Sequence, residues 1–98
     1  NDAEKYKIVD VMTQKFRELF EKKTRIAGKL ISEILTINGV RFILENGSWG
    51  LIRASSNKPS LVIVTESFQS ADEMKAIFKF IDNLLETTGK VGKYDQKI

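Results

Sequence analysis

The sequence predicts an α+β fold, a two-layer sandwich in which two helices cover one face of a four-stranded antiparallel sheet. Apolar residues recur at helical spacing near both ends of the chain, within residues 2–23 and 70–89. Between these segments the apolar period changes to two, which is typical of strands. Two Asn-Gly pairs interrupt this central segment and favour hairpins. The predicted order is therefore α-β-β-β-β-α, with both amphipathic helices packed on the sheet.

The first helix is predicted from residue 2 to residue 23. Asp2 is placed to cap its start, and the lysines at its end suit the negative end of the helix dipole. The apolar residues that recur at helical spacing are Ile8, Met12, Phe16, Leu19 and Phe20.

Four strands are predicted over residues 30–37, 40–45, 48–54 and 60–67. Asn38-Gly39 and Asn46-Gly47 join the first three strands into an antiparallel meander. Both residues of an Asn-Gly pair tolerate positive φ, so each pair is expected to form a type I′ turn. The fourth strand is rich in β-branched residues and follows a short polar segment.

The second helix is predicted to begin at Ser70, where Ser70 and Glu73 match the S-x-x-E capping box. Gly89 is expected to lie just past its end, and the polar tail after it to lie on the surface. The predicted apolar stripe consists of Met74, Ile77, Phe78, Ile81, Leu84 and Leu85.

Length and composition limit the possible functions. The 98 residues allow one domain, and the 42% hydrophobic and 30% charged residues are typical of a globular domain. The absence of cysteine and histidine excludes disulfides, thiolate chemistry and histidine general bases. The aspartates are well spread, so no metal site is predicted in this chain. Neither a membrane span nor a signal sequence is recognisable, and we expect a cytoplasmic protein.

The net charge of +3 allows, without requiring, a nucleic-acid partner. The most basic stretch, Lys22 to Lys29, is interpreted as a solvated helix end and loop. Trp49 is interpreted as either a packed strand residue or a stacking platform for a base or sugar. These features support, as the alternative hypothesis, a small basic module that binds nucleic acid or protein.

A polar segment between the third and fourth strands has the chemistry of an anion site. Its arginine offers a planar fork for two phosphate oxygens, and its small polar residues offer hydroxyl, amide and backbone donors. Read from its residues alone, the segment is equally a polar turn with an incidental arginine. The candidate phosphate ligands are Arg53, Ser55, Ser56 and Asn57, with Lys58 as a possible auxiliary charge before Pro59.

The sequence resembles the C-terminal domain, domain 4, of the α-D-phosphohexomutases, in particular the bacterial phosphomannomutase/phosphoglucomutase branch. The resemblance covers essentially the whole chain. That family carries an Arg-x-Ser-Asn/Gly-Thr-x-Pro loop, preceded by Gly-Val-Arg and Trp-Gly-Leu strands. The corresponding segments here are Gly39-Val40-Arg41, Trp49-Gly50-Leu51 and residues 53–59. Ser56 stands where the family has Asn or Gly, and Asn57 where it has Thr.

The resemblance implies that residues 1–98 form the last of four domains of an intramolecular phosphotransferase that interconverts hexose 1- and 6-phosphates through a phosphoserine and a bisphosphate. It implies a fold similar to one half of the TATA-binding protein. Arg53, Ser55, Ser56 and Asn57 would bind the phosphate of a mannose or glucose phosphate, and no catalytic residue would lie in this chain. The phosphoserine and Mg2+ would belong to other domains of the parent enzyme, so the isolated chain is expected to be inactive. Neither nucleic acid nor a membrane is an expected partner.

Overall fold

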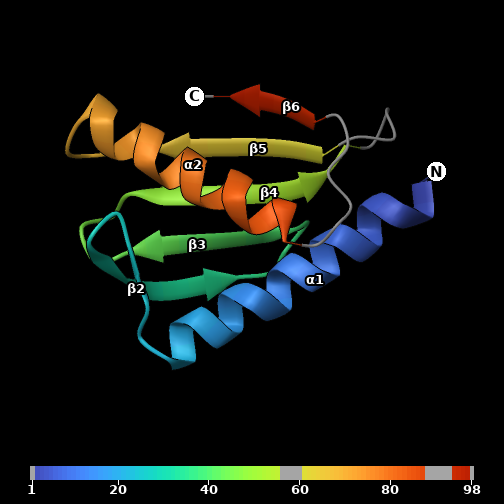
Figure 1. The fold of residues 1–98 in the computed structure, drawn as a ribbon, viewed down its shortest axis with the longest axis horizontal. Coiled ribbons are helices and arrows are strands. Elements are labelled where there is room, and N and C mark those ends of the chain that lie inside the picture. Colours follow the sequence, from blue (N-terminus) through green and yellow to red (C-terminus); the bar gives the residue numbers. More distant parts are fainter. Residues whose placement is uncertain (1, 56–60, 88–93, 98) are drawn as a thin grey trace.

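The structure is a computed structural model, and it describes residues 2–55, 61–87 and 94–97. Two helices lie on one face of a single sheet, which confirms the predicted α+β class (Figure 1). The elements, in chain order, are helix α1 (Asp2–Glu21), strands β1 (Arg25–Ile26), β2 (Lys29–Leu35), β3 (Val40–Leu44), β4 (Trp49–Ala54) and β5 (Leu61–Glu66), helix α2 (Ala71–Glu86) and strand β6 (Tyr94–Lys97).

The sheet contains the four predicted strands as β2 to β5, but in the described residues it has six strands, so the four-stranded prediction was incomplete. The strands follow one another in sequence order, and β1 to β5 pair antiparallel. Strand β6 comes from the tail that was expected only to lie on the surface, and it pairs parallel with β5. Backbone hydrogen bonds suffice to add such edge strands, which is why β1 and β6 show no clear hydrophobic alternation.

The two Asn-Gly turns differ from each other. Asn38 and Gly39 both have positive φ, at 56° and 116°, as the sequence suggested. At the second turn Gly47 has a φ of 91°, but the only described non-glycine residues with positive φ are Lys23, Ala27 and Asn38. The type I′ prediction for this turn was therefore wrong. The Gly47 amide donates to the Leu44 carbonyl at 2.8 Å, as in the longer hairpin turns that place a glycine in the left-handed region.

A single core fills the space between the helices and the sheet. Helix α1 packs on β2, β3 and β4, and α2 packs on β4 and β5. The rings of Phe16 and Phe42 stack across this layer with centroids 4.5 Å apart. Phe20, predicted to be on the apolar stripe of α1, is 43% exposed. Val9, which was not assigned to that stripe, is buried. The buried core residues are Val9, Met12, Phe16, Ile26, Ile31, Val40, Phe42, Leu44, Ile52, Leu61, Ile63, Ile77, Ile81 and Leu85.

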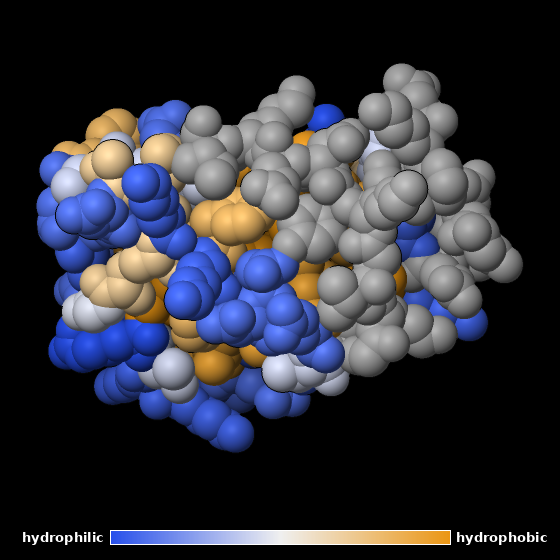
Figure 2. Space-filling view, turned by 45° about the horizontal axis from the view of Figure 1, so that its top comes forward, coloured by the Kyte–Doolittle hydropathy of each residue, from blue (hydrophilic) through white to orange (hydrophobic). Residues whose placement is uncertain are grey.

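Hydrophilic residues cover much of the outer surface. Figure 2 shows them on the face seen there, with hydrophobic surface visible between them near the centre. Large hydrophobic side chains are also exposed on the turns, where Ile37 is 84% and Phe68 is 68% exposed. These two residues flank opposite ends of the sheet and are single exposed side chains of a kind common on globular proteins.

Helix α2 begins with half of the predicted capping box. The Ser70 hydroxyl accepts a hydrogen bond from the Glu73 amide at 3.0 Å, as expected for an N-cap. The reciprocal bond is not formed, because the Ser70 amide donates instead to the Ser67 hydroxyl at 3.0 Å. The Glu73 side chain is therefore used elsewhere, and it turns into the interior.

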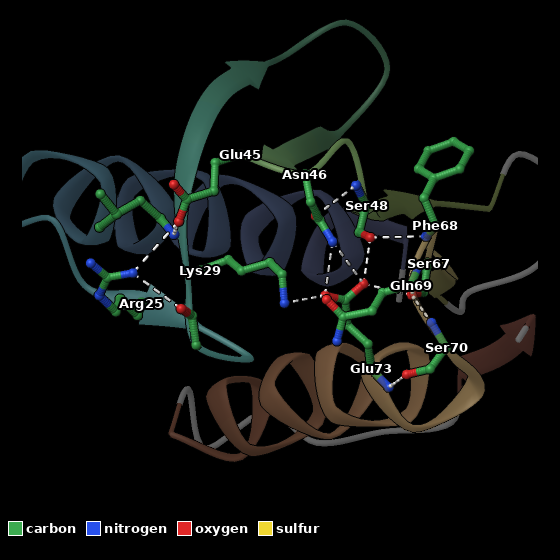
Figure 3. A network of polar contacts seen from close by, with 12 residues as sticks. Arg25, Lys29, Glu45, Asn46, Ser48, Ser67, Phe68, Gln69, Ser70 and Glu73 are labelled. Atoms are coloured by element: carbon green, nitrogen blue, oxygen red, sulfur yellow. Dashed lines mark hydrogen bonds and ion pairs between the residues drawn. The ribbon is translucent and has the colours of Figure 1, made fainter.

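Glu73 lies at the centre of a buried polar network that joins α2 to the sheet (Figure 3). Its carboxylate pairs with the Lys29 ammonium at 2.7 Å and accepts from the hydroxyls of Ser48 and Ser67 at 2.5 Å. The Asn46 amide also donates to it. Burial alone would raise the pKa of Glu73, but the contacts with Lys29, Ser48, Ser67 and Asn46 outweigh it and lower that pKa to about 2. The network thus holds an ionised carboxylate in the fold.

Candidate functional site

Two of the predicted phosphate ligands lie in the described part of the chain. Arg53 is the second-last residue of β4, is half-buried and pairs with Val62 of β5. Ser55 follows the strand directly and is 8% exposed. Ser56, Asn57 and the auxiliary Lys58 lie outside the described residues. The structure therefore places the start of the candidate loop and leaves its remaining residues as predictions.

Strand geometry sets the direction of Arg53. Its neighbour Ile52 is fully buried against the helices, and Ala54 packs on the same core. Because side chains alternate along a strand, Arg53 projects from the face that points away from the helices. Among residues 2–55, 61–87 and 94–97, none forms a hydrogen bond or ion pair with the guanidinium of Arg53.

Gly39 packs directly against the backbone of Arg53. A Cβ built on Gly39 would lie 2.3 Å from the Ile52 carbonyl oxygen and 2.7 Å from the Cβ of Arg53. Its φ of 116° is also a value that L side chains rarely adopt. Both facts require glycine, which lets the turn between β2 and β3 lie against β4 at the position of Arg53.

Helix α1, this turn and β4 together enclose a pocket beside Arg53. The pocket has a volume of about 510 Å³. Polar residues in its lining are Tyr6, Asp10 and Asn38, whose side chains can bond hydroxyl groups. Arg53 borders the pocket from β4, while strand alternation directs its side chain to the helix-free face. The lining residues are Tyr6, Val9, Asp10, Asn38, Gly39, Arg53 and Ala54.

Arg53 also borders a second pocket of about 340 Å³ on the helix-free face of the sheet. Arg41 and Leu51 line this pocket as well. The guanidinium of Arg41 lies 4.5 Å from the centre of the Trp49 ring. One face of Trp49 is thus covered by an arginine of the neighbouring strand, which supports the packing interpretation of Trp49 over the stacking platform.

Lys5 is the residue at this end of the fold that sequence reasoning missed. It is only 5% exposed, and its ammonium donates a hydrogen bond to the backbone carbonyl of Ser55. The sequence did contain a signal, because Lys5, Val9, Met12 and Phe16 follow the 4-3-4 spacing of a buried helix face. A lysine on such a face requires a buried partner.

The basic stretch from Lys22 to Lys29 divides into two parts. Lys22 and Lys23 are exposed after the end of α1, as the solvated interpretation expects. Lys29 instead pairs with the buried carboxylate of Glu73. The stretch therefore provides a smaller continuous basic surface than its sequence suggests.

The described ranges contain neither a metal-binding cluster nor a membrane-crossing helix. In residues 2–55, 61–87 and 94–97, no group of three or more Asp, Glu, His or Cys residues is arranged to hold a metal ion. In the same ranges, neither helix has the length and apolar character needed to cross a bilayer.

Comparisons with known proteins give a consistent family. The probable phosphoglucosamine mutase of Methanosphaera stadtmanae is 31% identical over 88 residues, which cover 86% of this chain and 18% of that protein. The phosphopentomutase of Thermococcus kodakarensis is 41% identical over 51 residues, which cover 52% of this chain and 11% of that protein. The chain thus spans less than a fifth of the length of these curated relatives. No solved structure gives a significant match.

The family comparison covers most of the fold, including Arg53 and every element from α1 to nearly the end of α2. Residues 2–84 match the family described as phosphoglucomutase/phosphomannomutase, C-terminal domain. Since this match extends over far more than half of the 98 residues, the chain belongs to the family of phosphoglucomutase/phosphomannomutase C-terminal domains.

Proposed function

We propose that this chain is the substrate-phosphate-binding domain of a phosphohexomutase. The loop binds the non-reacting phosphate group of the hexose phosphate. Its ligands are Arg53, Ser55, Ser56 and Asn57, and Lys58 adds positive charge. The observation that carries this proposal is the placement of Arg53, which is fixed by β4, has no partner among the described residues and borders the 510 Å³ pocket. A guanidinium held this way suits bidentate contact with a phosphate.

The composition of the pocket supports a sugar phosphate in particular. Arg53 offers donors to an anion, and the carboxylate of Asp10 offers acceptors to hydroxyl groups. The two relatives are named for different sugar phosphates, glucosamine and a pentose. A site that binds the phosphate and ignores most of the sugar would serve enzymes with different sugars, and the hexose proposed here is glucose or mannose.

The reaction requires groups that we assign to other domains of a longer, cytoplasmic enzyme. A phosphoserine there would donate and recover the phosphoryl group, and Mg2+ held there would offset negative charge. This chain would position the sugar phosphate, since phosphoryl transfer depends mostly on positioning and electrostatic stabilisation. Closure of the domain over the substrate would exclude water that otherwise hydrolyses the phosphoenzyme. The isolated chain would have no mutase activity.

Kinetics of an Arg53 variant test this proposal. In the full-length enzyme, the bisphosphate intermediate must present each of its phosphates to the serine in turn. The other phosphate then occupies this loop, attached to C1 in one half-reaction and to C6 in the other. Arg53→Ala should therefore lower kcat/KM from the 1-phosphate and from the 6-phosphate alike. A charge-assisted contact worth about 1.5–3 kcal/mol predicts a loss of about 10- to 150-fold.

Two further variants sharpen the result. Arg53→Lys should recover only part of the activity, because an ammonium cannot reproduce the bidentate fork. Arg25→Ala is the matched control, since it removes the same charge from an exposed ion pair with Glu45. Equal kcat/KM for Arg53→Ala and wild type in both directions would reduce Arg53 to a turn residue.

The small basic binding module is the alternative, and the family assignment disfavours it. Nucleic-acid binding would weaken steeply as salt is raised, because backbone phosphates release counterions. A sugar phosphate should compete for the Arg53 loop in the proposed function and should not displace a nucleic acid bound through Lys22 and Lys23.

A further inference from the structure

Lys5 occupies a position on α1 that the helix pattern reserves for an apolar side chain. Val9, Met12 and Phe16 form the buried face of α1, and Lys5 lies one turn before Val9 on the same face. Only 5% of Lys5 is exposed. Because burial of an ammonium is costly, its retention requires compensating contacts.

Those contacts connect α1 to the start of the candidate phosphate loop. The Lys5 ammonium donates to the backbone carbonyl of Ser55, fifty residues away in the sequence. It also lies 5.3 Å from the centre of the Tyr6 ring. Ser55 itself is 8% exposed and directly follows the strand that carries Arg53. Lys5 is thus bonded to the backbone of a proposed phosphate ligand.

Gly39 and Lys5 contact consecutive parts of this segment from different elements. The turn at Gly39 lies against the backbone of Arg53, and the helix residue Lys5 is bonded to Ser55. Tyr6, next to Lys5, lines the same pocket as Arg53. The path of the chain out of β4 is therefore fixed on both sides at the point where the ligands begin.

We propose that Lys5 is a positioning residue for phosphate binding, which holds the Ser55 backbone so that the loop presents its donors to the phosphate. This inference rests on the proposed function. The cationic hydrogen bond fixes the direction of the Ser55 carbonyl, and so the point at which the chain leaves β4. Preorganised donors bind an anion more tightly because less ordering remains to be done on binding.

Lys5→Met separates positioning from a merely structural role. Methionine keeps the length and the apolar stem of lysine, and an apolar side chain suits the buried face of α1. The variant should therefore fold with a Tm equal to or above that of wild type. Its affinity for glucose 6-phosphate should nevertheless fall about three- to tenfold, less than on loss of a direct phosphate contact, because the phosphate ligands themselves remain. A residue needed only for folding would lower the Tm and leave the affinity of the folded chain unchanged.

Lys7→Met is the matched control. Lys7 is exposed on the same helix and lies about 200° around the helix axis from Lys5. The substitution therefore removes one positive charge from α1 without affecting the hydrogen bond to Ser55. It should leave the affinity unchanged. In the ligand-free chain, Lys5→Met should shift the carbonyl ¹³C resonance of Ser55, and Lys7→Met should not. Lys5→Arg should restore part of the affinity.

The outcomes distinguish this inference from the proposed function. If wild type binds glucose 6-phosphate and Lys5→Met binds it equally well, the positioning role is wrong and the phosphate site stands. Equal losses in Lys5→Met and Lys7→Met would reveal a general charge effect and overturn the positioning role. No binding by wild type would overturn both.

Discussion

At the scale of single residues, Gly39 is the most constrained position near the site. Gly39→Ala should destabilise the fold, because alanine is strained at a φ of 116° and its Cβ would overlap the backbone at Arg53. Gly28→Ala is the matched control, since Gly28 also has positive φ, at 81°, but a Cβ there meets nothing within 4 Å. Chemical denaturation should show Gly39→Ala to be less stable than Gly28→Ala by about 1–3 kcal/mol, the usual cost of overpacking. Equal losses would mean that Gly39 does not press on β4.

A buried carboxylate gives the second prediction at this scale. The pKa of Glu73 in the folded chain is about 2, below its ordinary value of 4.5. Its contribution to stability is therefore complete above pH 4.5 and is lost as the pH falls towards 2, because the unfolded chain binds the proton first. Glu73→Gln should lower the free energy of unfolding at pH 7 by about 1–3 kcal/mol, since Lys29 and Asn46 lose their anionic acceptor.

The pH dependence separates this effect from a general loss of stability. Denaturation of Glu73→Gln between pH 4.5 and 2 should show a flatter decline than wild type. Glu45→Gln serves as the control, because the Glu45 side chain is 49% exposed in its ion pair with Arg25. It should keep the wild-type slope. Parallel curves for wild type and Glu73→Gln would contradict the low pKa of this carboxylate.

The sequence placed Arg53 correctly at the end of a strand, while its phosphate role stays a prediction, and it misjudged the direction of the Glu73 side chain. Arg53 lies within a local segment whose residue types are compatible with phosphate binding or with a polar turn, and the resemblance to a known family favoured the first. Glu73 was assigned to a capping box, because three-residue spacing identifies the cap but not the direction of the side chain. Its partners Lys29, in β2, and Ser48, in the turn before β4, are distant in the sequence, and contacts at such separations leave no local pattern. The 4-3-4 spacing placed Lys5 on the buried face of α1, but its hydrogen-bond partner Ser55 is distant in the sequence and left no local pattern.

At the scale of elements, the cap of α2 gives a direct test. The Ser70 hydroxyl accepts from the Glu73 amide at 3.0 Å. Ser70→Ala should lower the free energy of unfolding by about 1 kcal/mol, because one orphan donor of the first turn loses its partner. Ser70→Asp should retain the wild-type stability, since aspartate caps as well as serine. An unchanged denaturation midpoint for Ser70→Ala would show that this cap contributes nothing.

Strands with a two-residue period were predictable, and the edge strands were not. Val40, Phe42 and Leu44 alternate with less buried residues, and this pattern identified β3. Strand β1 has only two residues, too few for any period. Strand β6 is polar, and its pairing with Leu61–Val64 depends on backbone groups of a distant strand. The sheet order beyond the meander thus depends on tertiary contacts.

Gly89, expected to end α2, lies outside the described residues, and the helix ends at Glu86 with Thr87 as its cap.

At the scale of the whole molecule, the proposed function gives the two ends of the sheet different roles. The Glu73 network connects α2 to the turn before β4, and the proposed ligands Arg53 and Ser55 lie at the other end of that strand (Figures 1 and 3). Substitutions in the network should therefore change stability without changing phosphate affinity. Lys29→Met tests this separation, because it removes the cation that pairs with Glu73. A changed affinity in the folded fraction of Lys29→Met would show that the two ends are coupled.

The most direct test of the central claim is an NMR titration of the ¹⁵N-labelled chain with glucose 6-phosphate. The proposed function predicts weak binding, with a Kd of about 1 mM or more and thus a binding free energy on the order of −4 kcal/mol at most, because the rest of the substrate cleft would come from other domains. The amides of Ser55, Ser56 and Asn57 should show the largest shifts, and Arg53→Ala should abolish them. If the largest shifts map to Lys22–Lys29, or persist in Arg53→Ala, the phosphate site is not at the end of β4.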